Sequence, residues 1–154
     1  IPDFLDARPF SYAATHQVII IPIYAFATAT AVPEAVFTRP VLWFAMTGLG
    51  ASFALEVCRK LDPEAHPALR TYLTVSGPGR TAIAVAASVL LAVYGAYKIG
   101  VFAIMGPVAL VLLASLVLTM ARPTRFKWTA GFAGLFVLVQ VFAPTIAHIV
   151  GMLS

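Results

Sequence analysis

Residues 101–121, VFAIMGPVALVLLASLVLTMA, contain no charged side chain and decide the kind of fold. About 20 consecutive apolar residues in a helix are enough to cross the hydrocarbon core of a bilayer. Of the whole chain, 61% is apolar and only 10% is charged, whereas an average soluble domain is about 25% charged. Water could not solvate so much apolar surface, so the sequence predicts an integral membrane protein.

Four more apolar runs of similar length lie on either side of this stretch, and they predict spans over 10–32, 40–61, 81–99 and 127–152. The expected fold is therefore an all-α, polytopic transmembrane helical bundle of about five spans, folded as one domain over residues 1–154. Each run approaches the length that a bilayer requires.

Proline and glycine positions predict details of this bundle. Pro22 should kink the first span because proline removes a backbone hydrogen bond. Gly48 and Gly50 in the second span should let a neighbouring helix approach closely. Only Gly100 separates the spans over 81–99 and 101–121, so these two helices should be antiparallel neighbours.

The cations indicate an orientation. With five spans, one side of the membrane holds most of the lysines and arginines: Arg8, Arg59, Lys60, Arg70, Arg80, Arg122, Arg125 and Lys127. The other side holds Arg39 and Lys98. The positive-inside rule places loop 62–80 in the cytoplasm and the C-terminus outside. The expected location is a bacterial inner (cytoplasmic) membrane. Membrane topology also explains the net charge of +4 better than nucleic-acid binding does, so no nucleic-acid partner is expected.

Loop 62–80, DPEAHPALRTYLTVSGPGR, is the longest polar segment of the chain. Its prolines disfavour one long helix there. A short helix over 68–75 is expected, and the sequence Ser76-Gly77-Pro78-Gly79 should end it.

Glu56 is the most informative ionisable residue inside a predicted span, because such groups are costly in a membrane. Arg59 and Lys60 follow at i+3 and i+4, on the same helix face. One interpretation is structural: Glu56 pairs with Lys60, and both cations anchor the helix end. The other is a site for an anionic substrate, where Glu56 holds Mg²⁺ and the two cations bind phosphate oxygens.

Further candidates surround this helix end. Asp62 and Glu64 could supply more carboxylates to the metal, and Arg70 another positive charge. His16, about two turns into the first span, should lie at a depth close to that of Glu56. It could bond to another helix or line the site.

Two segments resemble bacterial members of the UbiA prenyltransferase superfamily. They are HQVIIIPIYAFATAT, which begins at His16, and LEVCRKLDPEAHPALRTYLTVSG, which begins at Leu55. The matching residues are His16, Pro22, Tyr24, Ala27-Thr28-Ala29, Glu56, Arg59-Lys60, Pro63-Glu64 and Thr71-Tyr72, within residues 10–77. The resemblance implies that the five spans correspond to the last five of nine.

The resemblance also implies an activity. Members of this family bind a prenyl diphosphate through Mg²⁺ and transfer the prenyl group to an aromatic or lipid-like acceptor. Glu56, Asp62 and Glu64 would hold the metal; Arg59, Lys60, Arg70 and His16 would bind substrate; Glu56 and Tyr72 would be catalytic. The chain departs from the family in lacking the first acidic motif and in carrying Arg59 and Lys60 where better-known members have aspartates. Catalysis would therefore need a missing N-terminal half, in the same polypeptide or a partner.

A second class of function stays open. A small accessory subunit of a larger respiratory or photosynthetic membrane complex could bind lipid, quinone or pigment in the same cavity. A transporter is less well supported because no internal repeat appears in the sequence.

Overall fold

The computed structural model of the chain describes residues 13, 15–63 and 72–151. Within these ranges the ordered elements are all helical. Four helices are long and apolar enough to cross a membrane: α4 (Arg39–Arg59), α5 (Tyr72–Lys98), α6 (Phe102–Ala121) and α7 (Phe126–Ile149), the last together with its preceding turn. These results agree with the predicted all-α class and with the composition of a membrane protein.

The first predicted span is not confirmed at full length. Its described part contains a helical stretch over 15–17 and then α3 (Ile20–Ala31), which is 12 residues long. A turn at 18–19 separates the two, with the Ile21 N–H donating to the Val18 carbonyl oxygen at 3.1 Å. Pro22 explains the break, since a proline ring clashes with the carbonyl four residues earlier. The helix is thus interrupted just before Pro22, and α3 alone is only about 18 Å long.

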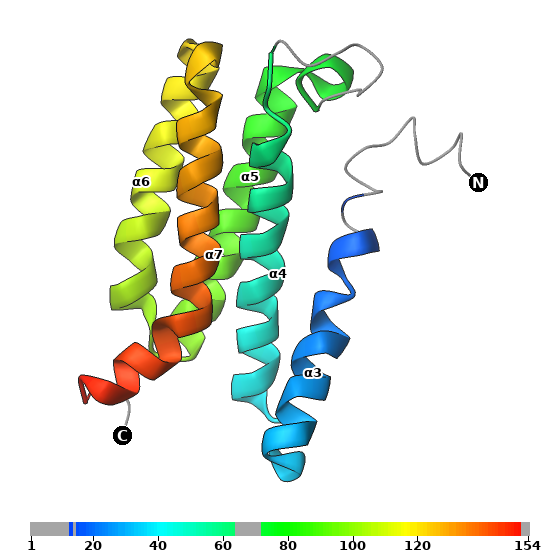
Figure 1. The fold of residues 1–154 in the computed structure, drawn as a ribbon, viewed down its shortest axis with the longest axis vertical. Helices are drawn as coiled ribbons and strands as arrows, with labels where there is room; N and C mark the ends of the chain where they lie inside the picture. The colour runs from blue at the N-terminus through cyan, green and yellow to red at the C-terminus, as the bar shows by residue number, and fades with distance from the viewer. Residues whose placement is uncertain (1–12, 14, 64–71, 152–154) are drawn as a thin grey trace.

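The four long helices form a closed ring in which α4 packs on α5, α5 on α6, α6 on α7, and α7 on α4. Figure 1 shows them side by side along the long axis of the molecule, with α3 outside the ring against α4. Successive helices run in opposite directions, so the last turn of α4 and the first turn of α5 share one end of the bundle.

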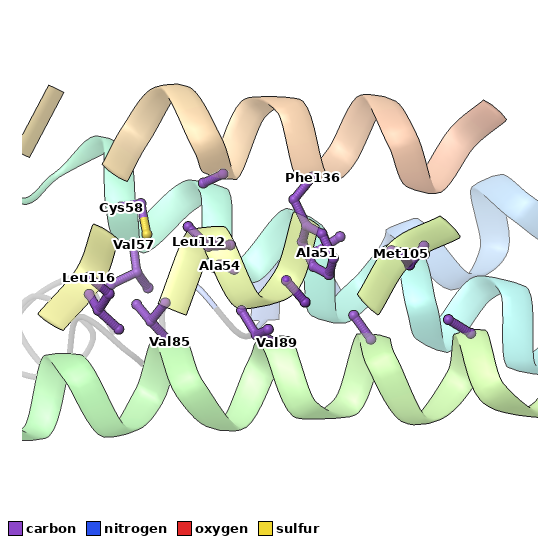
Figure 2. Packing of buried hydrophobic residues seen from close by; sticks show 14 of the residues in the cluster. Ala51, Ala54, Val57, Cys58, Val85, Val89, Met105, Leu112, Leu116 and Phe136 are labelled. Atoms are coloured by element: carbon purple, nitrogen blue, oxygen red, sulfur yellow. The ribbon is translucent and has the colours of Figure 1, made fainter. Parts of the chain in front are cut away.

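Small and medium apolar side chains fill the centre of the ring (Figure 2). Val57 from α4, Val85 from α5, Leu112 from α6 and Phe136 from α7 are completely buried. Alanines make up much of the remaining core, which allows the helix backbones to approach one another. The buried alanines include Ala51, Ala54, Ala92, Ala96, Ala109, Ala133, Ala143 and Ala147.

Gly48 and Gly50 in α4 let neighbouring helices approach closely, as the sequence predicted. A Cβ atom on Gly50 would lie 2.5 Å from the Ser88 carbonyl oxygen of α5, and one on Gly48 would lie 2.8 Å from the Tyr24 ring of α3. Both distances are shorter than van der Waals contact. Gly95 of α5 likewise faces α4 at Thr47.

The connections between helices are short. Gly100 (φ 78°) ends α5 with a paired hydrogen-bond motif: its own N–H donates to the Tyr97 carbonyl and the Val101 N–H to the Ala96 carbonyl. This arrangement needs a left-handed residue, which glycine adopts freely. The resulting tight turn makes α5 and α6 antiparallel neighbours, as predicted. Two 3-10 turns, η1 (Pro33–Ala35) and η3 (Pro123–Arg125), precede α4 and α7.

Candidate functional site

Glu56 and the two cations that follow it form a cluster on the last turns of α4. The Lys60 Nζ lies 2.5 Å from Glu56 Oε1, and an Arg59 guanidinium nitrogen lies 3.8 Å from Oε2. The helical spacing of i+3 and i+4 produces both contacts. The Glu56 side chain is 21% exposed and that of Arg59 is 62% exposed. The carboxylate is thus shielded at the bundle end, while Arg59 can reach outward.

Tyr72, at the start of α5, lies beside this cluster. The Lys60 Nζ is 5.8 Å from the centroid of its ring, within the range of a cation–π contact. Tyr72 is almost completely buried, with an exposed fraction of 2%. Its aromatic ring therefore forms a wall of the Glu56 end of the bundle.

A break in α5 positions Tyr72. Gly77 has φ 77° and ψ 162°, which is not helical, and Pro78 follows it. Residues 72–76 therefore form a short helix of their own, and the span proper begins at Pro78, close to the predicted start of the third span. The buried Thr81 hydroxyl lies 2.8 Å from the Gly77 carbonyl and 3.2 Å from the Tyr72 carbonyl. One hydroxyl thus holds both sides of the break together.

The other proposed metal ligands are described only in part. Asp62 is described and partly exposed, just after α4 ends, whereas Glu64 and Arg70 lie outside the described residues. Across the described ranges, no group of three or more His, Cys, Asp or Glu side chains is close enough to hold a metal ion.

His16 lies on the helical stretch that precedes α3, and it is exposed. His16 thus lies just before α3, whereas Glu56 lies near the end of α4, and both belong to the first half of the chain. α3 forms the later part of the first predicted span, and it packs against α4.

Sequence reasoning missed a partly buried polar pair between α3 and α7. The Tyr24 hydroxyl donates to Gln140 Oε1 at 2.9 Å. Gln140 is only 1% exposed, and its Nε2 has no hydrogen-bond partner among the residues that the structure describes. A glutamine inside the apolar run VLVQVFA is a visible signal for such a contact, since a polar group inside a membrane seeks a partner.

The centre of the ring does not provide a tunnel in the described part of the chain. A channel for a prenyl group along the inner faces of the helices would need open space there. Instead, Val57, Val85, Leu112 and Phe136 close the interior (Figure 2). An apolar groove of about 380 Å³ does lie between α5 and α6, and it is lined by residues such as Val93, Phe102 and Leu110.

Comparison of the chain with known protein families, with curated proteins and with solved structures finds no match.

Proposed function

We propose that this chain is part of a UbiA-type membrane prenyltransferase and binds a prenyl diphosphate at the Glu56 end of the bundle. The observation that carries the proposal is the cluster of Glu56, Arg59 and Lys60 beside the Tyr72 ring. It lies where apolar spans end and polar chain begins, which suits a ligand with a charged head and an apolar tail. The resemblance over residues 10–77 supports the same reading.

The proposed chemistry assigns a task to each of these side chains. Arg59 and Lys60 bind diphosphate oxygens with charge-assisted hydrogen bonds. The bond between the allylic carbon and the bridging oxygen breaks, and its electron pair leaves with the diphosphate. The acceptor then bonds to the allylic carbon and loses a proton. Because the Tyr72 ring already faces the Lys60 ammonium, it is suited to stabilise a positive charge.

Mg²⁺ would be held by Glu56 and Asp62, with Glu64 as a further ligand, and would neutralise charge on the leaving diphosphate. Glu56 must then exchange its contact with Lys60 for the metal. That exchange would release the Lys60 ammonium to the diphosphate. The proposal also requires the carboxylates of a second motif, from the same polypeptide or from a partner chain.

The packed ring changes where the prenyl tail can lie. With Phe136 and Leu112 filling the centre, the tail belongs on the outside of the α4–α7 ring. The face of α4 that carries α3 is the natural wall, because helices from a second half could close a channel there. In this arrangement the four-helix ring is a rigid support and not the channel itself.

The test is transfer of a radiolabelled prenyl group in membranes that contain the complete native protein. Glu56→Gln and Arg59→Gln should each lower transfer from geranylgeranyl diphosphate by about 100-fold or more, as removal of charge-stabilising groups commonly does. Arg125→Gln removes an exposed cation of η3 and is the matched control, which should keep normal activity. Transfer at the wild-type rate by the Glu56 and Arg59 variants would refute the proposal.

The accessory-subunit reading remains a second candidate. The observation that favours it is the pairing of Glu56 with Lys60 and Arg59 inside one helix, which gives the carboxylate a partner without any ligand. The mass of the isolated native protein separates the two readings. A mass near 16.4 kDa in stable association with other subunits favours the accessory role, whereas a mass of about twice that, as the nine-span resemblance implies, favours the enzyme.

A further inference from the structure

The end of the bundle opposite Glu56 contains a groove of about 640 Å³ between the first turns of α4 and the last turns of α5. We name it the Trp43 groove; its lining includes Arg39, Trp43 and Met46 from α4 and Tyr94 and Lys98 from α5. Two cations and two aromatic rings thus share one opening with apolar side chains. Nothing in the proposed prenyl-transfer chemistry uses these residues.

The close approach of α4 and α5 fixes the shape of this groove. Gly95 has no side chain to separate the helices, and a Cβ atom there would lie 3.0 Å from the Trp43 carbonyl oxygen. Above this contact, the Trp43 and Tyr94 rings meet edge to face, with their centroids 5.4 Å apart and an interplanar angle of 88°. The close packing of the two backbones therefore determines how the Trp43 and Tyr94 rings lie in the groove.

The two cations are held at the groove but are not neutralised. The Lys98 Nζ lies 5.2 Å from the centroid of the Tyr94 ring. Neither Arg39 nor Lys98 forms an ion pair with a carboxylate of the residues that the structure describes. Glu34 precedes α4 in η1 and forms no such pair either. The Trp43 groove therefore combines a net positive charge with an apolar and aromatic lining.

We propose that the Trp43 groove binds an anionic phospholipid, with the phosphodiester between Arg39 and Lys98 and an acyl chain along the apolar side of the groove. The charge complements a phosphate, and arginine is well suited to phosphate oxygens. Leu42 and Met46 continue the apolar lining along α4 below the cations. Tryptophan and tyrosine favour the level of lipid headgroups. This site is independent of the one proposed at Glu56 and lies at the other end of the bundle.

The two tryptophans of the chain make the site measurable. In a Trp128→Phe protein, Trp43 is the single tryptophan. Its fluorescence should be quenched more strongly by brominated phosphatidylglycerol than by brominated phosphatidylcholine, in detergent micelles with the full chain. Equal quenching by the two lipids would overturn the proposal, because it would show contact with bulk lipid without recognition of charge.

Variants then test the cations. Arg39→Gln/Lys98→Gln should weaken phosphatidylglycerol binding about tenfold or more, equivalent to about 1.4 kcal/mol, and both side chains are exposed, so the fold should persist. Arg122→Gln/Lys127→Gln removes two exposed cations from the other end and should leave the affinity unchanged. Circular dichroism checks that each variant is folded. Unchanged binding by the Arg39/Lys98 variant would refute the site.

Inorganic phosphate distinguishes a lipid from a free anion. Phosphate alone should fail to displace brominated phosphatidylglycerol from the Trp43 groove, because it lacks the acyl chain that contacts the apolar lining. Displacement by inorganic phosphate would overturn the assignment to a lipid.

Discussion

Gln140 poses a clear energetic problem at the residue scale. Its amide is buried in the apolar bundle, and among the described residues only its oxygen has a hydrogen-bond partner, the Tyr24 hydroxyl of α3. A buried polar group without a hydrogen bond costs about 1–3 kcal/mol in mutational measurements. The amide oxygen therefore links α7 to α3, while the unpaired Nε2 lowers the free energy of unfolding. Pro144 lies four residues later, which also deprives the Gln140 carbonyl of its helical donor.

This arrangement makes a prediction about paired substitutions. Tyr24→Phe should lower stability by about 1 kcal/mol, because it leaves the whole amide without a partner. Tyr24→Phe/Gln140→Leu should be more stable than Tyr24→Phe alone, since it removes the buried Gln140 amide together with its partner hydroxyl. Thermal unfolding in detergent measures both. A double variant less stable than the single variant would contradict the interpretation.

The candidate site was predictable only where it depends on neighbours in sequence. The pairing of Glu56 with Lys60 follows from helical spacing, and the structure has it. The burial of Tyr72 depends on the break at Gly77 and on Thr81, nine residues away, which no periodicity encodes. The contact of Tyr24 with Gln140 spans 116 positions in the sequence. Such contacts depend on which helices become neighbours.

At the scale of the element, α4 is the central helix of the structure. It contacts α3, α5 and α7, and one of its faces consists largely of small residues such as Gly50, Ala51 and Ala54. Lipid offers no hydrophobic reason for helices to associate, so close packing must supply the attraction. Small residues allow that packing by removing side-chain bulk between the backbones.

Gly50→Ala should therefore weaken the α4–α5 interface. The added methyl group would lie 2.5 Å from the Ser88 carbonyl and 2.9 Å from the Ala92 nitrogen, and both atoms belong to the backbone. Overpacking of this kind typically costs about 1–3 kcal/mol, so we expect a lower melting temperature in detergent.

Gly131→Ala in α7 is the matched control. A Cβ atom there meets nothing within 4 Å, and alanine favours a helix over glycine by about 1 kcal/mol. Its melting temperature should be unchanged or higher. Equal destabilisation by the two substitutions would show that steric contact at Gly50 is not the cause.

The positions of the long helices follow closely from the apolar runs. The run over 40–61 became α4 (Arg39–Arg59), and the run over 101–121 became α6 (Phe102–Ala121). These runs end at charged or proline-rich segments, where a helix in a membrane must end. The first run was less predictive, because Pro22 divides its helical residues and leaves α3 with 12 residues. Hydropathy also could not indicate that α7 returns to α4 to close the ring.

For the whole molecule, charge is separated between the two ends of the ring. Arg59, Lys60, Arg80, Arg122, Arg125 and Lys127 belong to the end that contains Glu56. Arg39 and Lys98 belong to the opposite end. The antiparallel order of α4 to α7 brings together cations that are far apart in the sequence. This distribution supports the proposal that the Glu56 end faces the cytoplasm.

Cysteine labelling tests that orientation. In a Cys58→Ser background, Phe37→Cys should react with a membrane-impermeant maleimide added to intact bacterial cells that express the chain. Thr124→Cys should react only after the membrane is opened. Phe37 and Thr124 are both exposed, and they lie at opposite ends of the ring. Labelling of Thr124→Cys but not Phe37→Cys in intact cells would reverse the orientation.

The contact of α7 with α4 has a consequence for biogenesis. A ribosome makes α4 before α7, so α4 must wait in the membrane through the synthesis of α5 and α6 before its last neighbour in the ring arrives. During that interval the α7-facing side of α4 is covered by lipid, by the insertion machinery or by another membrane protein. Nascent chains that stop after α6 should therefore be preferred targets of membrane proteases.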